Sequence, residues 1–206
     1  IYRLGANTST SKCAVISPSS RPDADVDYDF GQVDVNAPIV GKTMNCGNIS
    51  SAVGPYAIDE GMVKAVEPMT EVRIFNKNTQ KIIVEQVPVK DGRAVTEGDF
   101  AIDGVPGTGA KVTLKFIHPQ GAASGKLLPT GHVKDTIEIE GKTYEYSFVD
   151  SANPVIFVHP EDFGVTGTEI PAAFNALPNC KEICRILEII RGTGAITLGF
   201  AKDLED

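Results

Sequence analysis

Residues 44–60 constrain the fold most, because they place one helical pattern inside a sequence that otherwise reads as strands and turns. Apolar residues recur there at the spacing of one helical face, and Ile58 and Met62 add a further face, which predicts a buried helix. Pro55 conflicts with this pattern, since a proline inside a helix removes a hydrogen bond. Either the helix begins near Pro55, or Gly54 and Pro55 bend a longer one. The first face consists of Ile49, Ala52, Val53, Tyr56 and Ala57.

The start of this segment also has the residue types of a reactive site. Cys46 stands between Asn45 and the pair Gly47-Asn48, and the two serines Ser50-Ser51 follow. Free amides at a helix start attract anions and favour a thiolate over a thiol. Cys46 is therefore a candidate reactive thiol, with a buried structural cysteine as the alternative interpretation.

The rest of the chain predicts a mostly antiparallel sheet system. Alternating apolar and polar residues are typical of half-buried strands, and an asparagine-rich turn at 76–79 joins two of them into a hairpin. A second hairpin turns at Gly141-Lys142, and short apolar runs predict further strands. The expected strands are 13–17, 26–35, 71–75, 81–89, 111–117, 135–140, 143–148 and 155–158, and the expected later helices are 168–177 and 179–191, the latter capped by Asn179.

Composition limits the partners of the protein. Its 206 residues suit one or two domains, and 20 glycines with 13 prolines indicate many turns. The net charge of −8 argues against nucleic acid or an anionic membrane as a partner, because both require basic surfaces. A small anionic substrate is still compatible, since one pocket can be positive on an acidic protein. No apolar run reaches the length of a membrane span.

The cysteines and histidines predict neither a disulfide framework nor a metal site. The spacing of the four cysteines matches no disulfide pattern, and the three histidines are far apart. Cys180 and Cys184 share one face of an expected helix, and we interpret them as small core residues. Reduced thiols without an export signal favour a cytoplasmic location.

Lys12 lies where a loop rich in serine and threonine meets the expected strand 13–17. Taken alone, this position is typical of a solvated loop lysine.

Three stretches together resemble the PrpF-type isomerases. This family includes methylaconitate isomerase, methylitaconate delta-isomerase and oxalomesaconate tautomerase, and the resemblance spans essentially the whole chain. The start of the helix at Asn45-Cys46-Gly47-Asn48 is its most specific part. The stretches are 10–18, 45–57, and 125–131 followed by Asn153-Pro154.

The resemblance implies an α+β fold of the diaminopimelate-epimerase type, with two similar domains that each wrap a mostly antiparallel, β-barrel-like sheet around a central helix. Family members are about twice this length. We therefore expect residues 1–148 to form the first domain without its N-terminal segment, and residues 149–206 to begin an incomplete second domain.

The resemblance also implies a reaction and its residues. The family moves a C=C bond in an unsaturated di- or tricarboxylate by proton transfer, without a cofactor. Lys12 and Cys46 match the family's catalytic lysine and cysteine, and which of them removes the first proton is left open. A lysine shielded from water would be a base, and a charged one would stabilise an enolate. The expected substrate-binding residues are Asn45, Gly47, Asn48, Ser50, Ser51 and Asn153, with Thr10 and Ser11 as weaker candidates.

Two other functions are compatible with the sequence. Amino-acid epimerases of the same fold use two opposed cysteines, and neither Cys180 nor Cys184 lies at a glycine-rich helix start as such a partner would. An accessory protein of a dehydratase, without catalysis, is the second alternative. The sequence does not specify the substrate within the class, and a homo-oligomer is compatible with it.

Overall fold

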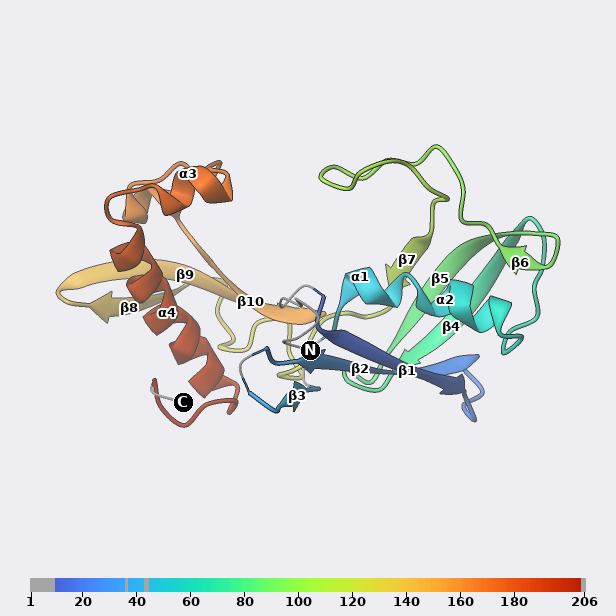
Figure 1. Ribbon diagram of the computed structural model, residues 1–206. Helices are drawn as coiled ribbons and strands as arrows, with labels where there is room; N and C mark the ends of the chain where they lie inside the picture. The colour runs from blue at the N-terminus through green and yellow to red at the C-terminus, as the bar shows by residue number, and fades with distance from the viewer. Residues whose placement is uncertain (1–9, 36, 43–44, 205–206) are drawn as a thin grey trace. The chain divides into compact units, whose positions relative to one another are not determined.

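The computed structural model describes residues 10–35, 37–42 and 45–204, and the chain divides into the compact units Ile1–Pro119 and Gln120–Asp206 (Figure 1). The sequence-based boundary after Phe148 differs from this division. Phe148 lies inside β9 (Lys142–Ser151), which pairs with β8 (Asp135–Ile139) on one side and β10 (Asn153–Val158) on the other. A division at 148 would separate hydrogen-bonded strands, so the β8–β9 hairpin belongs with the second unit.

The first unit contains a seven-stranded, mostly antiparallel sheet. Its order is β1-β2-β4-β5-β6, with β3 also paired to β2 and β7 to β5, and among the described residues only β2 and β4 pair in parallel. The pairings between described residues form an open path, so the expected barrel-like closure is not seen here. The strands are β1 (Lys12–Pro18), β2 (Val26–Val33), β3 (Val40–Gly41), β4 (Met69–Asn76), β5 (Lys81–Lys90), β6 (Arg93–Ala94) and β7 (Thr113–Phe116).

The expected central helix is two short helices, α1 (Gly47–Ser50) and α2 (Val53–Asp59). Pro55 is the third residue of α2, where a backbone N–H would have no partner within the helix, so proline is tolerated. This confirms that the main helix begins near Pro55. The prediction of burial on both faces is wrong, because Tyr56 is 47% exposed and Ala52 is also exposed. The buried face of α2 consists of Val53, Gly54, Ala57 and Ile58.

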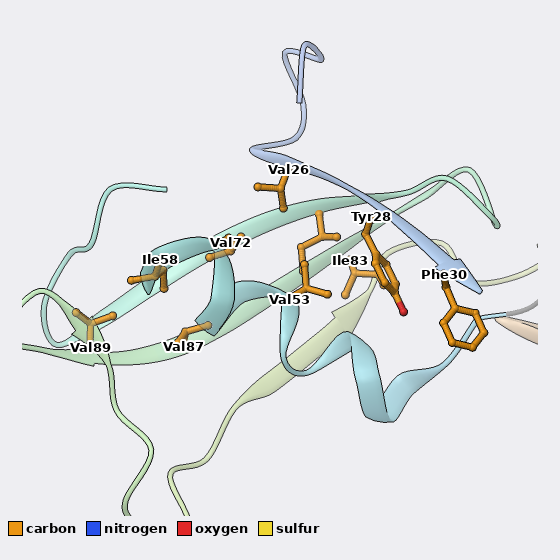
Figure 2. Close-up of a cluster of buried hydrophobic side chains, with 11 residues drawn as sticks. Val26, Tyr28, Phe30, Val53, Ile58, Val72, Ile83, Val87 and Val89 are labelled. Carbon is orange, nitrogen blue, oxygen red and sulfur yellow. The ribbon is translucent and has the colours of Figure 1, made fainter. Parts of the chain in front are cut away.

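The core of the first unit lies between the inner face of the sheet and α2. Every second residue of β2 from Val26 to Phe30 is buried, and Figure 2 shows Val26, Tyr28 and Phe30 pointing towards the side where the helices lie. Val53 and Ile58 of α2 pack against this cluster (Figure 2). The hairpin predicted around residues 76–79 is confirmed as β4 and β5, which pair from Met69↔Pro88 to Asn76↔Lys81.

β1 is less buried than its apolar sequence predicts. Val15 is 64% exposed and Cys13 is exposed, whereas Ala14 and Ile16 pack against the core. Side chains alternate between the two faces of a strand, and only the face of β1 that carries Ala14 and Ile16 packs against the core.

The second unit packs α4 (Cys180–Thr197) against the sheet of β8, β9 and β10, with a 3-10 turn (Pro160–Phe163) and α3 (Pro171–Asn175) between. The predicted hairpin at Gly141 is confirmed. Asn179 stands at the cap position of α4, but its side chain makes no capping bond, and the helix runs beyond the expected end at Arg191. The helix buries three of its isoleucines, Ile183, Ile186 and Ile190.

The interpretation of Cys180 and Cys184 as core residues is wrong. Cys184 is exposed and Cys180 is only half-buried, since the isoleucine face of α4 turns towards the sheet instead. Partial burial raises the pKa of the Cys180 thiol, and the neighbouring Cys184 adds to the effect. Among the described residues there is no group of three histidine, cysteine or acidic side chains that could hold a metal ion. No helix within the described ranges is long and apolar enough to cross a membrane.

Candidate active site

Lys12 is the first residue of β1 and lies on the inner face of the sheet. Its partner across the ladder is Gln32, just as Ala14 pairs with Phe30 and Ile16 with Tyr28. Because side chains alternate along a strand, Lys12 shares its face with Ala14 and Ile16. Lys12 is half-buried, so it is not the fully solvated loop lysine that its local sequence alone suggests.

Cys46 precedes α1 directly and occupies its N-cap position. It is half-buried and packs against the core cluster of the first unit. The Ser50 backbone N–H donates to the Cys46 carbonyl at 3.0 Å, and the Ser50 hydroxyl donates to the same oxygen at 2.7 Å. The Cys46 carbonyl therefore accepts two hydrogen bonds from Ser50.

Asn45 and Ser50, both expected to bind substrate, are engaged inside the protein. Asn45 is buried, and its Oδ1 accepts a hydrogen bond from Nδ2 of Asn76 at 2.7 Å. Ser50 is 0% exposed, and its hydroxyl also lies 3.5 Å from Asn45 Oδ1. These contacts fix the chain around Cys46, so the two residues are suited to positioning it rather than to touching a ligand.

Gly47, Asn48 and Ser51 face solvent more than their neighbours. Gly47 and Asn48 are exposed, and their backbone amides precede the first intrahelical hydrogen bond, which Ser50 donates. The Ser51 hydroxyl donates to the Asn48 carbonyl at 2.7 Å. Because α1 has only four residues, few peptide dipoles are aligned. An anion at this position would therefore be bound by the individual amides of Gly47 and Asn48, with little contribution from a helix dipole.

A cavity of about 300 Å³ separates the strand that carries Lys12 from the helices that follow Cys46. Ala14 and Ile16 form its strand side, on the face that also holds Lys12. Its helical side begins with Ile49, one turn after Cys46. The cavity therefore lies between β1, which begins with Lys12, and the helices that follow Cys46, but neither Lys12 nor Cys46 is among the residues that line it. The residues that line it, most of them apolar, are Ala14, Ile16, Ile49, Ala52, Val53 and Tyr56.

Tyr28 lies next to this arrangement and was not singled out from the sequence. It is fully buried, and burial raises the pKa of its phenol to about 12, with the Ser50 hydroxyl opposing the shift and the Cys46 and Cys13 thiols adding to it. The alternation of β2 predicts that Tyr28 is buried, but only the folded chain shows that its hydroxyl faces the Cys46 segment.

Thr10 and Ser11 lie immediately before β1. Ser11 is 4% exposed, and its carbonyl accepts hydrogen bonds from the Val33 backbone and from Nε2 of Gln32, each at 2.9 Å. These bonds tie the chain before Lys12 to β2. Thr10 is exposed.

Asn153 belongs to the second unit, whereas the other predicted site residues belong to the first. It opens β10 and pairs with Ser151 across a tight turn, in which Ala152 has a φ of 63°. Asp150, which precedes Ser151 on β9, is fully buried.

Asp150 connects the Asn153 turn to the loop containing residues 125–131. Its Oδ2 accepts bonds from the backbone amides of Ala123 and Ser124 and from the Ser124 hydroxyl, at 2.7–2.9 Å. Its own amide donates to the Leu127 carbonyl at 2.8 Å. Asp150 therefore bonds the loop through both its carboxyl group and its backbone amide, close to the turn that precedes Asn153.

Glu85 is the other residue that the sequence analysis missed. It is fully buried on β5, where a signal did exist: a carboxyl interrupts the apolar alternation of Ile83 and Val87. Burial raises its pKa to about 7, opposed by a hydrogen bond from the Gly54 amide.

Comparisons with known proteins agree on one group. Residues 4–206 match the family model described as PrpF protein. The chain is 49% identical over 197 residues to the 3-methylitaconate isomerase of Eubacterium barkeri, covering 96% of this chain and 51% of that protein. It is 47% identical over 165 residues to the 4-oxalomesaconate tautomerase of Pseudomonas putida, covering 80% and 45%. It is 39% identical over 209 residues to the 2-methyl-aconitate isomerase of Cupriavidus necator, covering 98% and 52%.

A solved structure gives the same relationship. The crystal structure of a methylitaconate-delta-isomerase superimposes with a TM-score of 0.79 at 48% sequence identity, over 98% of this chain and 51% of that one. The chain thus spans about half the length of the relatives it matches.

Proposed function

The chain belongs to the PrpF family, and we propose on that premise that the full-length protein carrying it is a cofactor-independent isomerase. It shifts a carbon–carbon double bond in a small unsaturated di- or tricarboxylate. The observation that carries this proposal is the match of residues 4–206 to the PrpF family, together with the 49% identity to a 3-methylitaconate isomerase.

The proposed reaction is a proton shift with no net change in atoms. A base removes a proton from a carbon next to the double bond, and the electron pair delocalises through the double bond onto a substrate carboxylate. An acid then returns a proton to the far carbon, which leaves the double bond displaced. Such a reaction requires two groups that exchange protons and donors that stabilise the dienolate. Lys12 and Cys46 are assigned to these proton transfers.

The anion requires donors that face a ligand. The exposed amides of Gly47 and Asn48 are suited to a substrate carboxylate. Ser51 is assigned to substrate binding beside them, although its hydroxyl donates to the Asn48 carbonyl in this structure. Asn153 is assigned to substrate binding from the second unit, and Thr10 and Ser11 are weaker assignments next to Lys12. We assign Asn45 and Ser50 to holding Cys46 in place, because both are buried and bonded to protein.

The experiment incubates the full-length protein in D₂O with methylitaconate, methylaconitate and oxalomesaconate in turn. Deuterium at two carbons together with migration of the double bond supports the isomerase. Exchange only at the α-carbon of an added amino acid would favour an epimerase, and no exchange with any acid of the panel would favour an accessory protein.

The location and partners are also proposals. Four free cysteines support a cytoplasmic location, since reducing compartments maintain thiols. The proposed partner is a small unsaturated carboxylate, and neither nucleic acid nor a membrane is proposed, in keeping with the net charge of −8.

A further inference from the structure

Glu85 places a carboxyl group where the core would otherwise be apolar. It stands on the inner face of β5 between Ile83 and Val87, and its side chain is 0% exposed. Its ladder partners are Val72 on β4 and Leu114 on β7. Burying a carboxyl group costs free energy unless it is hydrogen-bonded, so a residue of this kind in a core requires a reason.

One oxygen of Glu85 has a partner and the other has none. Oε2 accepts a hydrogen bond from the backbone amide of Gly54 at 2.6 Å, in the first turn of α2. Oε1 is buried without a hydrogen-bond partner. The first amides of a helix lack partners within the helix, so the carboxyl satisfies one of them from the sheet below.

Gly54 is required for this contact. A Cβ added at Gly54 would lie 2.6 Å from Oε2 of Glu85 and 2.8 Å from Cγ2 of Val87. Any residue with a side chain would therefore push the carboxyl away from the helix. The absence of a side chain at Gly54 thus leaves the space that the Glu85 carboxyl occupies.

No charged side chain faces Glu85 from the described elements that pack against it. The inner face of β4 carries Thr70, Val72, Ile74 and Asn76, and the inner face of β7 carries Leu114 and Phe116. On α2 the only charged residue is Asp59, which is exposed and accepts from the Ala94 amide. The pKa of the Glu85 carboxyl is therefore shifted by two causes, burial and the hydrogen bond from the Gly54 amide.

The segment around Cys46 is tied to the sheet by polar contacts at both ends. At its start, Asn45 is bonded to Asn76 of β4, and after α1, Gly54 is bonded to Glu85 of β5. Between these two contacts lie Cys46 and the exposed amides of Gly47 and Asn48. Displacing either end would move the segment that the proposed reaction uses.

We propose that Glu85 is a positioning residue: through the Gly54 amide it fixes the start of α2, and thereby the place of Cys46 relative to the strand that carries Lys12. The expected effect of Glu85 on isomerisation rests on the proposed function. Its effect on the position of Cys46 does not. The raised pKa of the carboxyl, about 7, further indicates that the strength of this anchor changes near neutral pH.

The test measures alkylation of Cys46 by iodoacetamide, resolved by peptide mass spectrometry, in the full-length protein. Glu85→Leu removes the anchor, Glu85→Gln keeps an acceptor for Gly54 without an ionisable group, and Glu71→Gln is the matched control on the exposed face of neighbouring β4. We expect Glu85→Leu to change the alkylation rate several-fold and the control to leave it unchanged. Glu85→Gln should stay close to the wild type in rate but lose a step in the pH profile centred near pH 7.

The proposal is overturned if a folded Glu85→Leu protein alkylates at the wild-type rate. Should Glu85→Leu fail to fold, Gly54→Ala decides, because its added methyl group would lie 2.6 Å from Oε2 of Glu85 and displace the same contact, and an unchanged alkylation rate in that variant overturns the proposal. In the D₂O exchange assay, Glu85→Leu should lower kcat more than it changes KM. Altered alkylation in a protein that isomerises nothing would reject the proposed function while supporting the role of Glu85.

Discussion

The side-chain amide of Asn76 donates to Oδ1 of Asn45 across 2.7 Å, which ties the end of β4 to the residue before Cys46. Asn76 is fully buried, and its own Oδ1 accepts from the backbone amides of Asn78 and Thr79 at 2.9 and 3.2 Å. One side chain thus closes the β4–β5 turn and supports the candidate active site.

Asn76→Asp should weaken this link, because it removes the donor to Asn45 while keeping an acceptor for the turn. A buried polar atom without its partner costs about 1–3 kcal/mol, and we expect a loss of that size in the free energy of unfolding. Urea denaturation measures it. Asn78→Asp is the comparison, because Asn78 is a turn residue that bonds to Phe30 and not to Asn45. Asn76→Asp should change the alkylation rate of Cys46 more than Asn78→Asp does. Equal rates in the two variants would contradict the role of Asn76 in holding the Cys46 segment.

Lys12→Ala and Cys46→Ala should each lower kcat by about 10²-fold or more, the scale of general acid–base catalysis. The assay is double-bond migration in D₂O with the full-length protein. Lys115→Ala and Cys13→Ala are matched controls at exposed positions, and both should retain near wild-type turnover. Near wild-type turnover in Lys12→Ala and Cys46→Ala would instead remove both role assignments.

The stability of the first unit should depend on pH through Glu85. Its pKa is about 7 in the folded protein against an ordinary 4.5, so the native state holds more protons than the unfolded state between these values. The free energy of unfolding therefore falls as pH rises through this window, by about 3 kcal/mol in total. Urea unfolding at pH 5 and pH 8 should show this fall in the wild type and not in Glu85→Gln. An equal fall in both would assign it to other groups.

Gly54→Ala should destabilise the protein by about 1–3 kcal/mol, the usual cost of overpacking a core. The cause is the collision of the added methyl group with the Glu85 carboxyl and with Val87. Thermal unfolding followed by circular dichroism measures the effect. Gly47→Ala is the control, since nothing lies within 4 Å of a Cβ at that exposed glycine. A similar loss in both variants would show that the close contact is not responsible.

Asp150→Ala should loosen the loop that contains Lys126. The substitution removes the acceptor of three hydrogen bonds, from the amides of Ala123 and Ser124 and from the Ser124 hydroxyl. Losing a charged acceptor costs about 1.5–3 kcal/mol, so we expect roughly ten- to hundredfold faster tryptic cleavage after Lys126, which is exposed. Glu161→Gln, at an exposed position of the same unit, should cleave at the wild-type rate.

Local patterns were sufficient for most of the strands. The alternation in β2 and the turns at 76–79 and at Gly141 correctly predicted the strand and both hairpins, because a hairpin is formed by neighbours in the chain. The helical spacing after Cys46 was also correct in type, although the break at Ser51–Ala52 divides it into two helices. The residues that resemble the PrpF-type isomerases pointed to the family that the comparisons then confirmed.

Contacts between distant residues were decided only by the tertiary structure. Asn45 and Ser50 were expected to face a ligand, yet both are buried. Asn45 is bonded to Asn76 at the end of β4, a residue 31 positions away in the sequence. Periodicity showed that Tyr28 would be inside, but not that its hydroxyl would face the Cys46 segment. The pairing of Glu85 with Gly54 joins residues 31 positions apart. A sequence pattern specifies which face of an element is buried, whereas the partner on that face depends on how the elements pack.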